Sequence, residues 1–144
     1  YDAVIQTLSG RYRGILLCDL RDGSYKIIKA AEDLKDNLTK YTDFREFLRG
    51  YSRSCIRPEF RNRIERLAEY GYMREQFRSG EKQIEELYRI RSGSWQRVMA
   101  IPFAPESDLK ARAILAFDIQ DGEVEKRMER LRPRWLYPRF IPWS

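Results

Sequence analysis

Three strand-length stretches joined by short connections constrain the fold of this chain more than any other feature of its sequence. They are KQIEELYRIRSG from Lys82, SWQRVMAIPF from Ser94 and ARAILAFDI from Ala111. The first two alternate between two sets of side chains with a period of two, as half-buried strands do. Because the connections SGS and APESDLK are short, neighbouring strands must run antiparallel. This part of the chain therefore predicts a three-stranded meander.

A second strand pair is predicted nearer the N-terminus. The stretches RGILLCDL from Arg13 and YKIIKA from Tyr25 have strand length and are separated by Asp22-Gly23, a typical hairpin turn. Ahead of them, apolar side chains recur at steps of three and four up to the Ser9-Gly10 pair, which indicates one stripe of a helix. Its members are Tyr1, Val4, Ile5, Leu8 and Tyr12.

The pattern between the two strand groups is helical. A first helix has Thr42 or Asp43 as its N-cap and an apolar face made of Phe44, Phe47, Leu48 and Tyr51. A second helix has Pro58 in its first turn and an apolar stripe made of Phe60, Ile64, Leu67 and Ala68. A short third helix ends at Gly80. We expect these helices to form one layer.

The order of these elements predicts the fold class. It is an α+β fold, a five-stranded antiparallel sheet with helices on one face and with flanking N- and C-terminal helices. We expect an N-terminal cap helix over residues 1–12, a domain over 13–120, a linker helix over 121–132 and a tail over 133–144 that is rich in proline, aromatic and basic residues. The sequence starts at Tyr1 rather than Met, so we interpret it as a piece of a longer protein.

Charge and composition exclude several classes of function. The net charge is +6, but residues 126–144 carry six basic residues against one acidic residue, and the other 125 residues are nearly neutral. A neutral body argues against a nucleic-acid-binding fold. No run of about 18 apolar residues predicts a membrane span, no signal peptide is visible, and Cys18 and Cys55 have no metal-ligand spacing. We expect a cytoplasmic protein with reduced thiols.

Catalysis is not indicated either. The chain has no histidine, which is the commonest general base and metal ligand, and it carries none of the common enzyme motifs. We therefore predict no enzyme activity and no metal site. One alternative that stays open is a small α+β enzyme using carboxylates such as Asp19 or Asp118. Another is a basic-tailed interaction domain that binds nucleic acid or a membrane surface.

Four segments in order resemble a PAS domain, the sensory module found in front of diguanylate cyclases, phosphodiesterases and histidine kinases. They are YDAVIQTLSGRYRGILLCDLRDGSYKII, IRPEFRNRI, SGSWQRVMAIPF and LAFDIQD. The second departs from the usual pattern at Phe60, where an acidic residue is common. The last resembles the D-I-T-like tripeptide that precedes the linker to an effector, with Asp118, Ile119 and Gln120 in its three positions.

The resemblance implies a sensory role in bacterial signal transduction. It implies a homodimer formed through the flanking helices, and an output through Asp118, Ile119 and Gln120 to a cyclase, phosphodiesterase or kinase. Asp118 would receive hydrogen bonds from the linker backbone or pair with a nearby arginine. A strand-end turn aspartate remains the alternative reading.

The resemblance also implies a sheet that can hold a small organic ligand. Arg89, Arg91 and Arg97 lie on or beside the meander strands, and an inward-facing arginine holds a carboxylate with two hydrogen bonds. Alternatively, they face solvent and pair with Glu85 or Glu86. We name those three arginines with Met99 and Phe117 as ligand candidates, although Met99 and Phe117 also suit a plain core. No cofactor is identified. Haem is not expected without histidine, and the sequence around Cys55 does not match a photoactive flavin domain.

The C-terminal segments leave two further questions. Val124, Met128 and Leu131 make one short apolar stripe on a charged helix, which is typical of a coiled-coil seam, a docking strip or a helix packed on its own domain. Pro133 and two later prolines end that helix. The aromatic and basic tail suits a fold-back onto the domain or a dimer contact, and a membrane surface or nucleic acid is the alternative.

Overall fold

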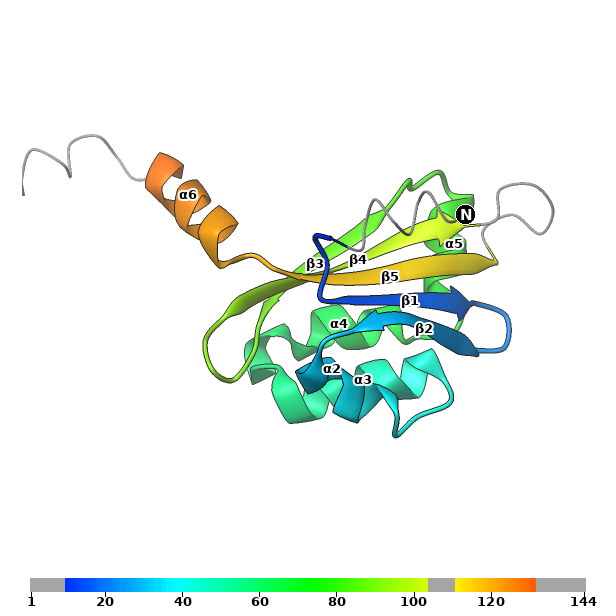
Figure 1. Ribbon diagram of the computed structural model, residues 1–144. Coiled ribbons are helices and arrows are strands. Elements are labelled where there is room, and N and C mark those ends of the chain that lie inside the picture. Colours follow the sequence, from blue (N-terminus) through cyan, green and yellow to red (C-terminus); the bar gives the residue numbers. More distant parts are fainter. Residues whose placement is uncertain (1–9, 104–110, 132–144) are drawn as a thin grey trace, which may run out of the picture.

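One antiparallel sheet organises the structure, a computed structural model that describes residues 10–103 and 111–131 (Figure 1). The five strands follow the order β2-β1-β5-β4-β3 across the sheet. They span β1 Gly14–Asp19, β2 Tyr25–Ala30, β3 Ile84–Arg89, β4 Trp95–Phe103 and β5 Arg112–Ile119. The predicted hairpin and meander are thus confirmed, and β5 joins them because it pairs with β1 on one side and β4 on the other.

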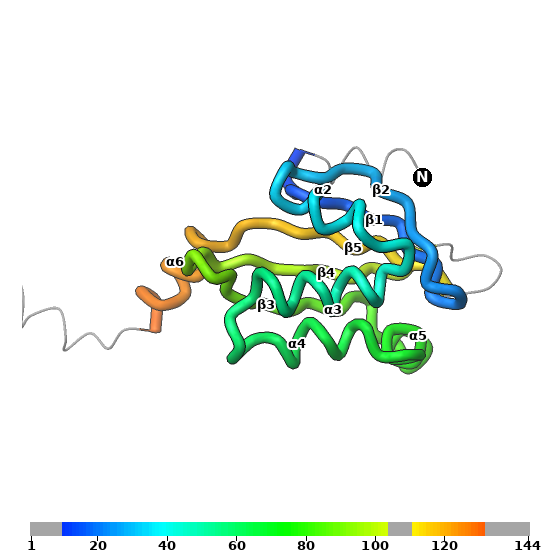
Figure 2. Tube along the Cα trace, turned by 90° about the horizontal axis from the view of Figure 1, so that it is seen from below, coloured from blue at the N-terminus to red at the C-terminus, as the bar shows by residue number. Residues whose placement is uncertain are grey.

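The helices between β2 and β3 cover one face of this sheet, as predicted (Figures 1 and 2). They are α2 Glu32–Leu38, α3 Phe44–Cys55, the 3-10 turn η1 Pro58–Phe60, α4 Arg61–Leu67 and α5 Tyr72–Arg78. The sequence pattern missed α2. This helix buries only Leu34 and Leu38, one turn apart, so it leaves too few apolar positions to show a stripe.

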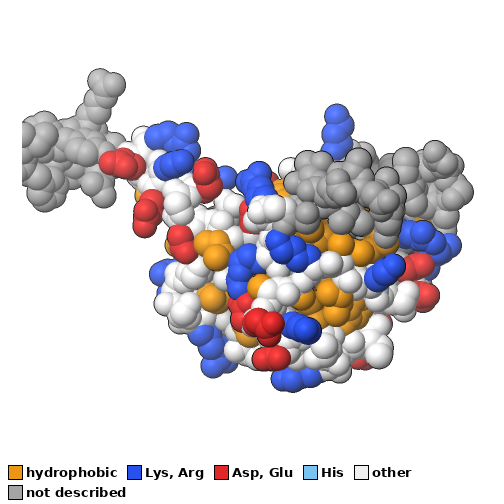
Figure 3. Space-filling model, viewed as in Figure 1, with side chains coloured by type: hydrophobic (Ala, Val, Ile, Leu, Met, Phe, Trp, Pro, Cys, Tyr) orange, Lys and Arg blue, Asp and Glu red, His pale blue; other side chains and the backbone are white. Residues whose placement is uncertain are grey.

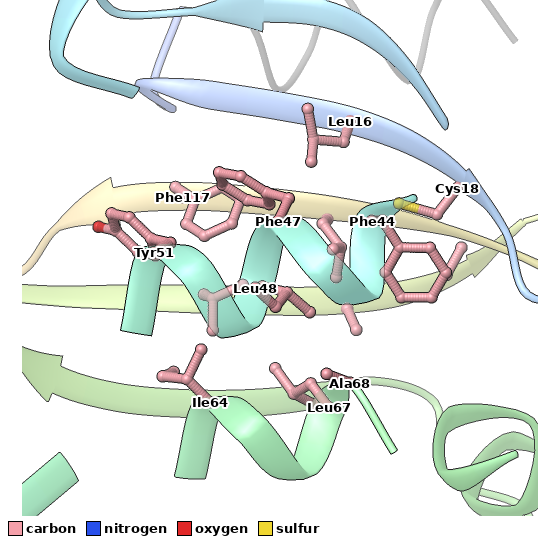
Figure 4. Packing of buried hydrophobic residues seen from close by; sticks show 14 of the residues in the cluster. Leu16, Cys18, Phe44, Phe47, Leu48, Tyr51, Ile64, Leu67, Ala68 and Phe117 are labelled. Carbon is pink, nitrogen blue, oxygen red and sulfur yellow. The ribbon is translucent and has the colours of Figure 1, made fainter. Parts of the chain in front are cut away.

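The core lies between the sheet and α3 and α4 (Figure 4). Phe47 and Tyr51 stack along α3, and the ring of Phe117 on β5 meets both of them edge-on. These three side chains are buried, and aromatic pairs of this kind add to the free energy gained by burial. The predicted apolar face of the first helix is therefore the face that contacts the central strand.

The start of α3 is tied to the first hairpin. Asp43 caps the helix by accepting a 2.7 Å hydrogen bond from the backbone N–H of Arg45, which decides between the two predicted caps. The N–H of Phe44 donates to the carbonyl of Gly23 at 2.8 Å. Gly23 has a φ of 84°, and a Cβ there would collide with the Asp43 carboxylate. The turn therefore requires glycine.

The opposite, outer face of the sheet carries a second apolar cluster. Its buried members come from three strands and the segment before β1, namely Tyr12, Ile15, Met99, Ile114 and Ala116. Residues 10–12, the end of the predicted N-terminal helix, are not helical, and residues 1–9 lie outside the described residues. Cys18 and Cys55 are free thiols, Cys18 in the core and Cys55 half-buried against it.

Helix α6 spans Asp121–Leu131, in the region where the sequence predicts a linker helix over residues 121–132. It follows β5 after a single residue, Gln120, and projects away from the sheet and helix layers (Figures 1 and 2). None of its residues is buried. Of the interpretations that the sequence left open, packing of α6 on its own domain is not what the structure shows.

Candidate functional site at the junction of β5 and α6

A buried carboxylate lies at the end of the central strand. Asp118 is 3% exposed and points to the outer face of β5, opposite its neighbour Phe117. Arg97, its register partner on β4, donates from Nε to Oδ1 at 3.0 Å and from Nη2 to Oδ2 at 2.6 Å. This two-bond geometry is the strongest form of an arginine–carboxylate pair. It fulfils the expectation that Asp118 pairs with a nearby arginine.

Other groups complete the environment of this pair. The side-chain amide of Gln120 donates to Asp118 Oδ2 at 2.9 Å, and Arg11 Nε lies 3.6 Å from the same oxygen. Arg97 also donates to Glu85 on β3 at 2.5 Å, the cross-strand partner anticipated from the sequence. Burial of Arg97 acts to lower its pKa, but the hydrogen bonds to Asp118 and Glu85 prevail and raise it. Arg97 therefore stays charged and bound across three strands.

A second aspartate fixes the first turn of α6 to the hairpin between β3 and β4. Asp121 accepts hydrogen bonds from the backbone N–H of Trp95 at 2.7 Å and from the hydroxyl of Ser94 at 2.8 Å. The N–H of Gln120 donates to the carbonyl of Trp95 at 2.8 Å. We call Asp121, Ser94 and Trp95 the linker clamp. It holds the helix at its start, where a carboxylate also suits the helix dipole.

The sequence reasoning missed the clamp. Asp121 precedes Gly122 at the start of a charged helix, which reads as an ordinary first-turn acidic residue. Its partners lie 26 and 27 positions earlier in the chain. The sequence signal that was available is the place of Asp121 directly after Gln120, the last residue of the tripeptide named in the resemblance.

The five residues proposed for ligand binding are not brought together. Phe117 packs in the core under the helices, whereas Met99 belongs to the outer cluster. Arg97 lies near Met99 on the outer face but is engaged by Asp118 and Glu85. Arg89 stacks on the ring of Trp95 and donates to the carbonyl of Gly93. Arg91 donates to the carbonyl of Arg53 at the end of α3.

The space under the helices holds a polar cluster instead of an arginine. The hydroxyls of Tyr51 and Tyr88 lie 3.1 Å apart, and Tyr51 donates to the side-chain carbonyl of Gln96 at 3.3 Å. Burial raises the pKa of both tyrosines, so both hydroxyls remain protonated. Gln96 directly follows Trp95 of the linker clamp on β4. The polar cluster and the clamp are thus neighbours along one strand.

Taken with the sheet order, this arrangement defines the class of fold. A five-stranded antiparallel sheet in the order β2-β1-β5-β4-β3, with helices inserted between β2 and β3 and the chain leaving from β5, is PAS-like. The assignment rests on the topology of this chain itself.

No protein-family model and no curated protein matches the sequence. Among solved structures, a domain of a protein from Haloarcula marismortui, described as a candidate light and redox sensing histidine kinase, superposes with a TM-score of 0.48 at 11% identity. The match covers 83% of this chain and 98% of that chain.

Two further observations concern the described residues alone. Among them, no three histidine, cysteine, aspartate or glutamate side chains are grouped as ligands for a metal ion. None of the helices in residues 10–103 and 111–131 has the length and apolar character needed to cross a membrane.

The Arg97–Asp118 pair should show a large coupling energy. In a double-mutant cycle with Arg97→Ala and Asp118→Ala, read by urea unfolding, we expect a coupling of about 2 kcal/mol, because both side chains are largely removed from water. The Arg21–Asp19 pair is a matched control. Its guanidinium is 46% exposed, so we expect below about 1 kcal/mol there. Equal couplings would contradict this prediction.

Loss of the clamp should loosen α6. In Asp121→Ala, amide hydrogen exchange in residues 122–131 should accelerate roughly tenfold or more, because two hydrogen bonds to a carboxylate are lost. Glu123→Ala is the control on the same helical turn, since Glu123 makes only a 3.7 Å ion pair with Lys126. Asp118→Ala should accelerate the same amides less. Unchanged exchange in 120–131 in both aspartate variants would argue against a junction that holds the helix.

Proposed function

We propose that this chain is a non-catalytic, PAS-like sensory and assembly module of a bacterial signalling protein, acting in the cytoplasm. The observation that carries the proposal is the route by which the chain leaves the domain. Central strand β5 continues through Gln120 into α6, and two aspartates bind this exit to β4 and to the β3–β4 hairpin. A displacement of the sheet would therefore be transmitted to α6.

The proposed signal starts in the helix layer. Tyr51 on α3 contacts Phe117 of β5 and hydrogen-bonds to Gln96 of β4, so it reaches both strands that form the exit. A small organic ligand that displaced α3, or a partner protein that bound it, would therefore shift the position of Gln96. The next residue, Trp95, would carry that shift to Asp121. An effector such as a cyclase, phosphodiesterase or kinase would respond to α6.

We also propose a homodimer. Helix α6 has 11 residues, about one and a half heptads, which is short for a coiled coil on its own. The longer apolar stripe of the predicted N-terminal helix is better suited to supply most of the contact between copies. In this proposal α6 is the moving output and the N-terminal segment is the fixed contact.

The relay is tested by a hydroxyl deletion far from α6. Tyr51→Phe removes the bonds to Tyr88 and Gln96. We expect faster exchange in residues 121–131 by about threefold to tenfold, the effect of the one lost hydrogen bond, to Gln96, that lies on the proposed relay. Tyr25→Phe is the matched control, because that hydroxyl also makes two hydrogen bonds, to the carbonyls of Leu38 and Tyr41, at the opposite edge of the sheet.

Combining Tyr51→Phe with Asp121→Ala tests whether the effect on α6 passes through the linker clamp. If Asp121→Ala abolishes the effect of Tyr51→Phe on α6, the signal passes through the clamp. An equal effect of Tyr25→Phe, or no effect of Tyr51→Phe, would show that α6 does not sense the helix layer and would overturn the relay.

The assembly and ligand parts are tested by native mass spectrometry of the full chain over a range of concentrations. We expect a dimer, because in this proposal the apolar stripe of the predicted N-terminal helix contacts a second copy. Additional non-covalent mass would identify a ligand, and a dimer without it would indicate a module used for assembly. A monomer at all concentrations would refute the proposed dimer.

A further inference from the structure

A groove runs between α6 and the β3–β4 hairpin. It has a volume of about 610 Å³ and is lined on the hairpin side by Arg89, Gly93 and Trp95. On the α6 side it is lined by Asp121, Val124, Glu125, Met128 and Glu129. A groove of this volume can hold several side chains of a peptide or a small molecule. Asp121 and Trp95 of the linker clamp are among its lining residues.

The α6 wall of this groove has a defined chemistry. Val124 and Met128 lie one turn apart and provide an apolar row, and Met128 is 65% exposed. Asp121, Glu125 and Glu129 lie at the same spacing and form an acidic row beside it. The basic residues of α6 do not line the groove, and Lys126 pairs with Glu123 instead. The visible surface of α6 is dominated by charged side chains (Figure 3). An apolar row beside three carboxylates suits an occupant that is both aromatic and cationic.

The chain contains such a segment immediately after α6. Residues 132–144 hold three arginines and no acidic residue, together with Trp135, Tyr137, Phe140 and Trp143. Three prolines favour an extended polyproline II conformation, with three residues per turn. In that conformation Tyr137, Phe140 and Trp143, spaced by three, share one face. The sequence thus favours an extended segment with aromatic side chains on one face and arginines at positions between them.

The segment is long enough to return along the helix. The 11 residues of α6 span about 16 Å at 1.5 Å per residue. Residues 133–144 would span about 37 Å in polyproline II at 3.1 Å per residue. Pro133 ends the helix where a reversal has to begin. The whole groove up to Trp95 is therefore within reach of the tail of the same molecule.

We propose that residues 133–144 dock into the groove between α6 and the β3–β4 hairpin of the same molecule. Their aromatic side chains cover Val124 and Met128, and Arg134 and Arg139 pair with Glu125 and Glu129. The docked tail buttresses α6 against the hairpin, so it would restrain the output helix of the proposed module. The docking itself does not depend on that function.

The three methionines of the chain provide a direct probe in the full-length protein. With methyl-labelled methionine, the Met128 resonance should lie at high field because aromatic rings cover it. Deletion of 133–144 should return it toward an exposed position and accelerate exchange of the α6 amides by about tenfold. Met73 and Met99, both buried elsewhere, should not move and serve as internal controls.

Charge reversal keeps the test decisive if the deletion frays the helix. Glu125→Lys with Glu129→Lys should release Met128 in the intact chain, and adding Arg134→Glu with Arg139→Glu should restore it. Glu123→Lys, a reversal outside the groove lining, should have no such effect. An unshifted Met128 in all variants would overturn the proposal. A Met128 shift that depends on protein concentration would show that the tail of a second copy fills the groove, and would refute docking within one molecule.

Discussion

The pairing of β5 with both β1 and β4 is the constraint on which the other features of this molecule depend. Within the described sheet, the β1–β2 hairpin pairs with the later strands through β5, whose side chains are buried on both faces between Ala113 and Asp118. Phe117 meets the helix layer on one face, and Asp118 is held on the other. Any displacement of β5 would disturb both faces at once, so the strand is a rigid connection between the core and the chain exit.

Burying a carboxylate at the end of such a strand is costly unless it is paired and hydrogen-bonded. Asp118 meets that requirement with the guanidinium of Arg97 and the amide of Gln120. Hydrophobic side chains could fill the same space, but they would not fix the direction in which the chain leaves. Arg97 has to lie against β3, β4 and β5 to reach both carboxylates. The polar network therefore ties the exit of the chain to all three strands.

What the sequence predicted follows from local periodicity. Alternation in β4 groups Val98 with Ala100, because a period of two assigns every second side chain to one face. The structure then shows that this face is the one under the helices. Helix α2 was missed because two apolar residues do not make a stripe. The Asp118–Arg97 pair was anticipated only as pairing with a nearby arginine. The register of β4 against β5, which are separated by eight residues, cannot be predicted from the sequence. The linker clamp depends on the same register and was missed altogether.

The ligand candidates also show what the sequence does not predict. Arg89, Arg91 and Arg97 were chosen because arginines on strands can face inward, but residue type does not say which face a side chain occupies or what already binds it. The strand alternation already put Arg97 on the face of Met99 rather than that of Val98. In the structure Arg97 is engaged by two carboxylates, and the inward polar positions belong to Tyr88 and Gln96.

A helix as short as α6 depends on its junction with β5 for stability. An isolated helix of about eleven residues is marginal in water, because nucleation is costly and few hydrogen bonds repay it. Helix α6 buries none of its residues, so burial in the domain does not stabilise it. Asp121 anchors the first turn through Trp95. A helix held at one end only is sensitive to small changes at that end, and a second contact along its length would remove that sensitivity. Under the proposed function, filling of the groove beside Met128 would therefore set how strongly α6 responds to the sheet.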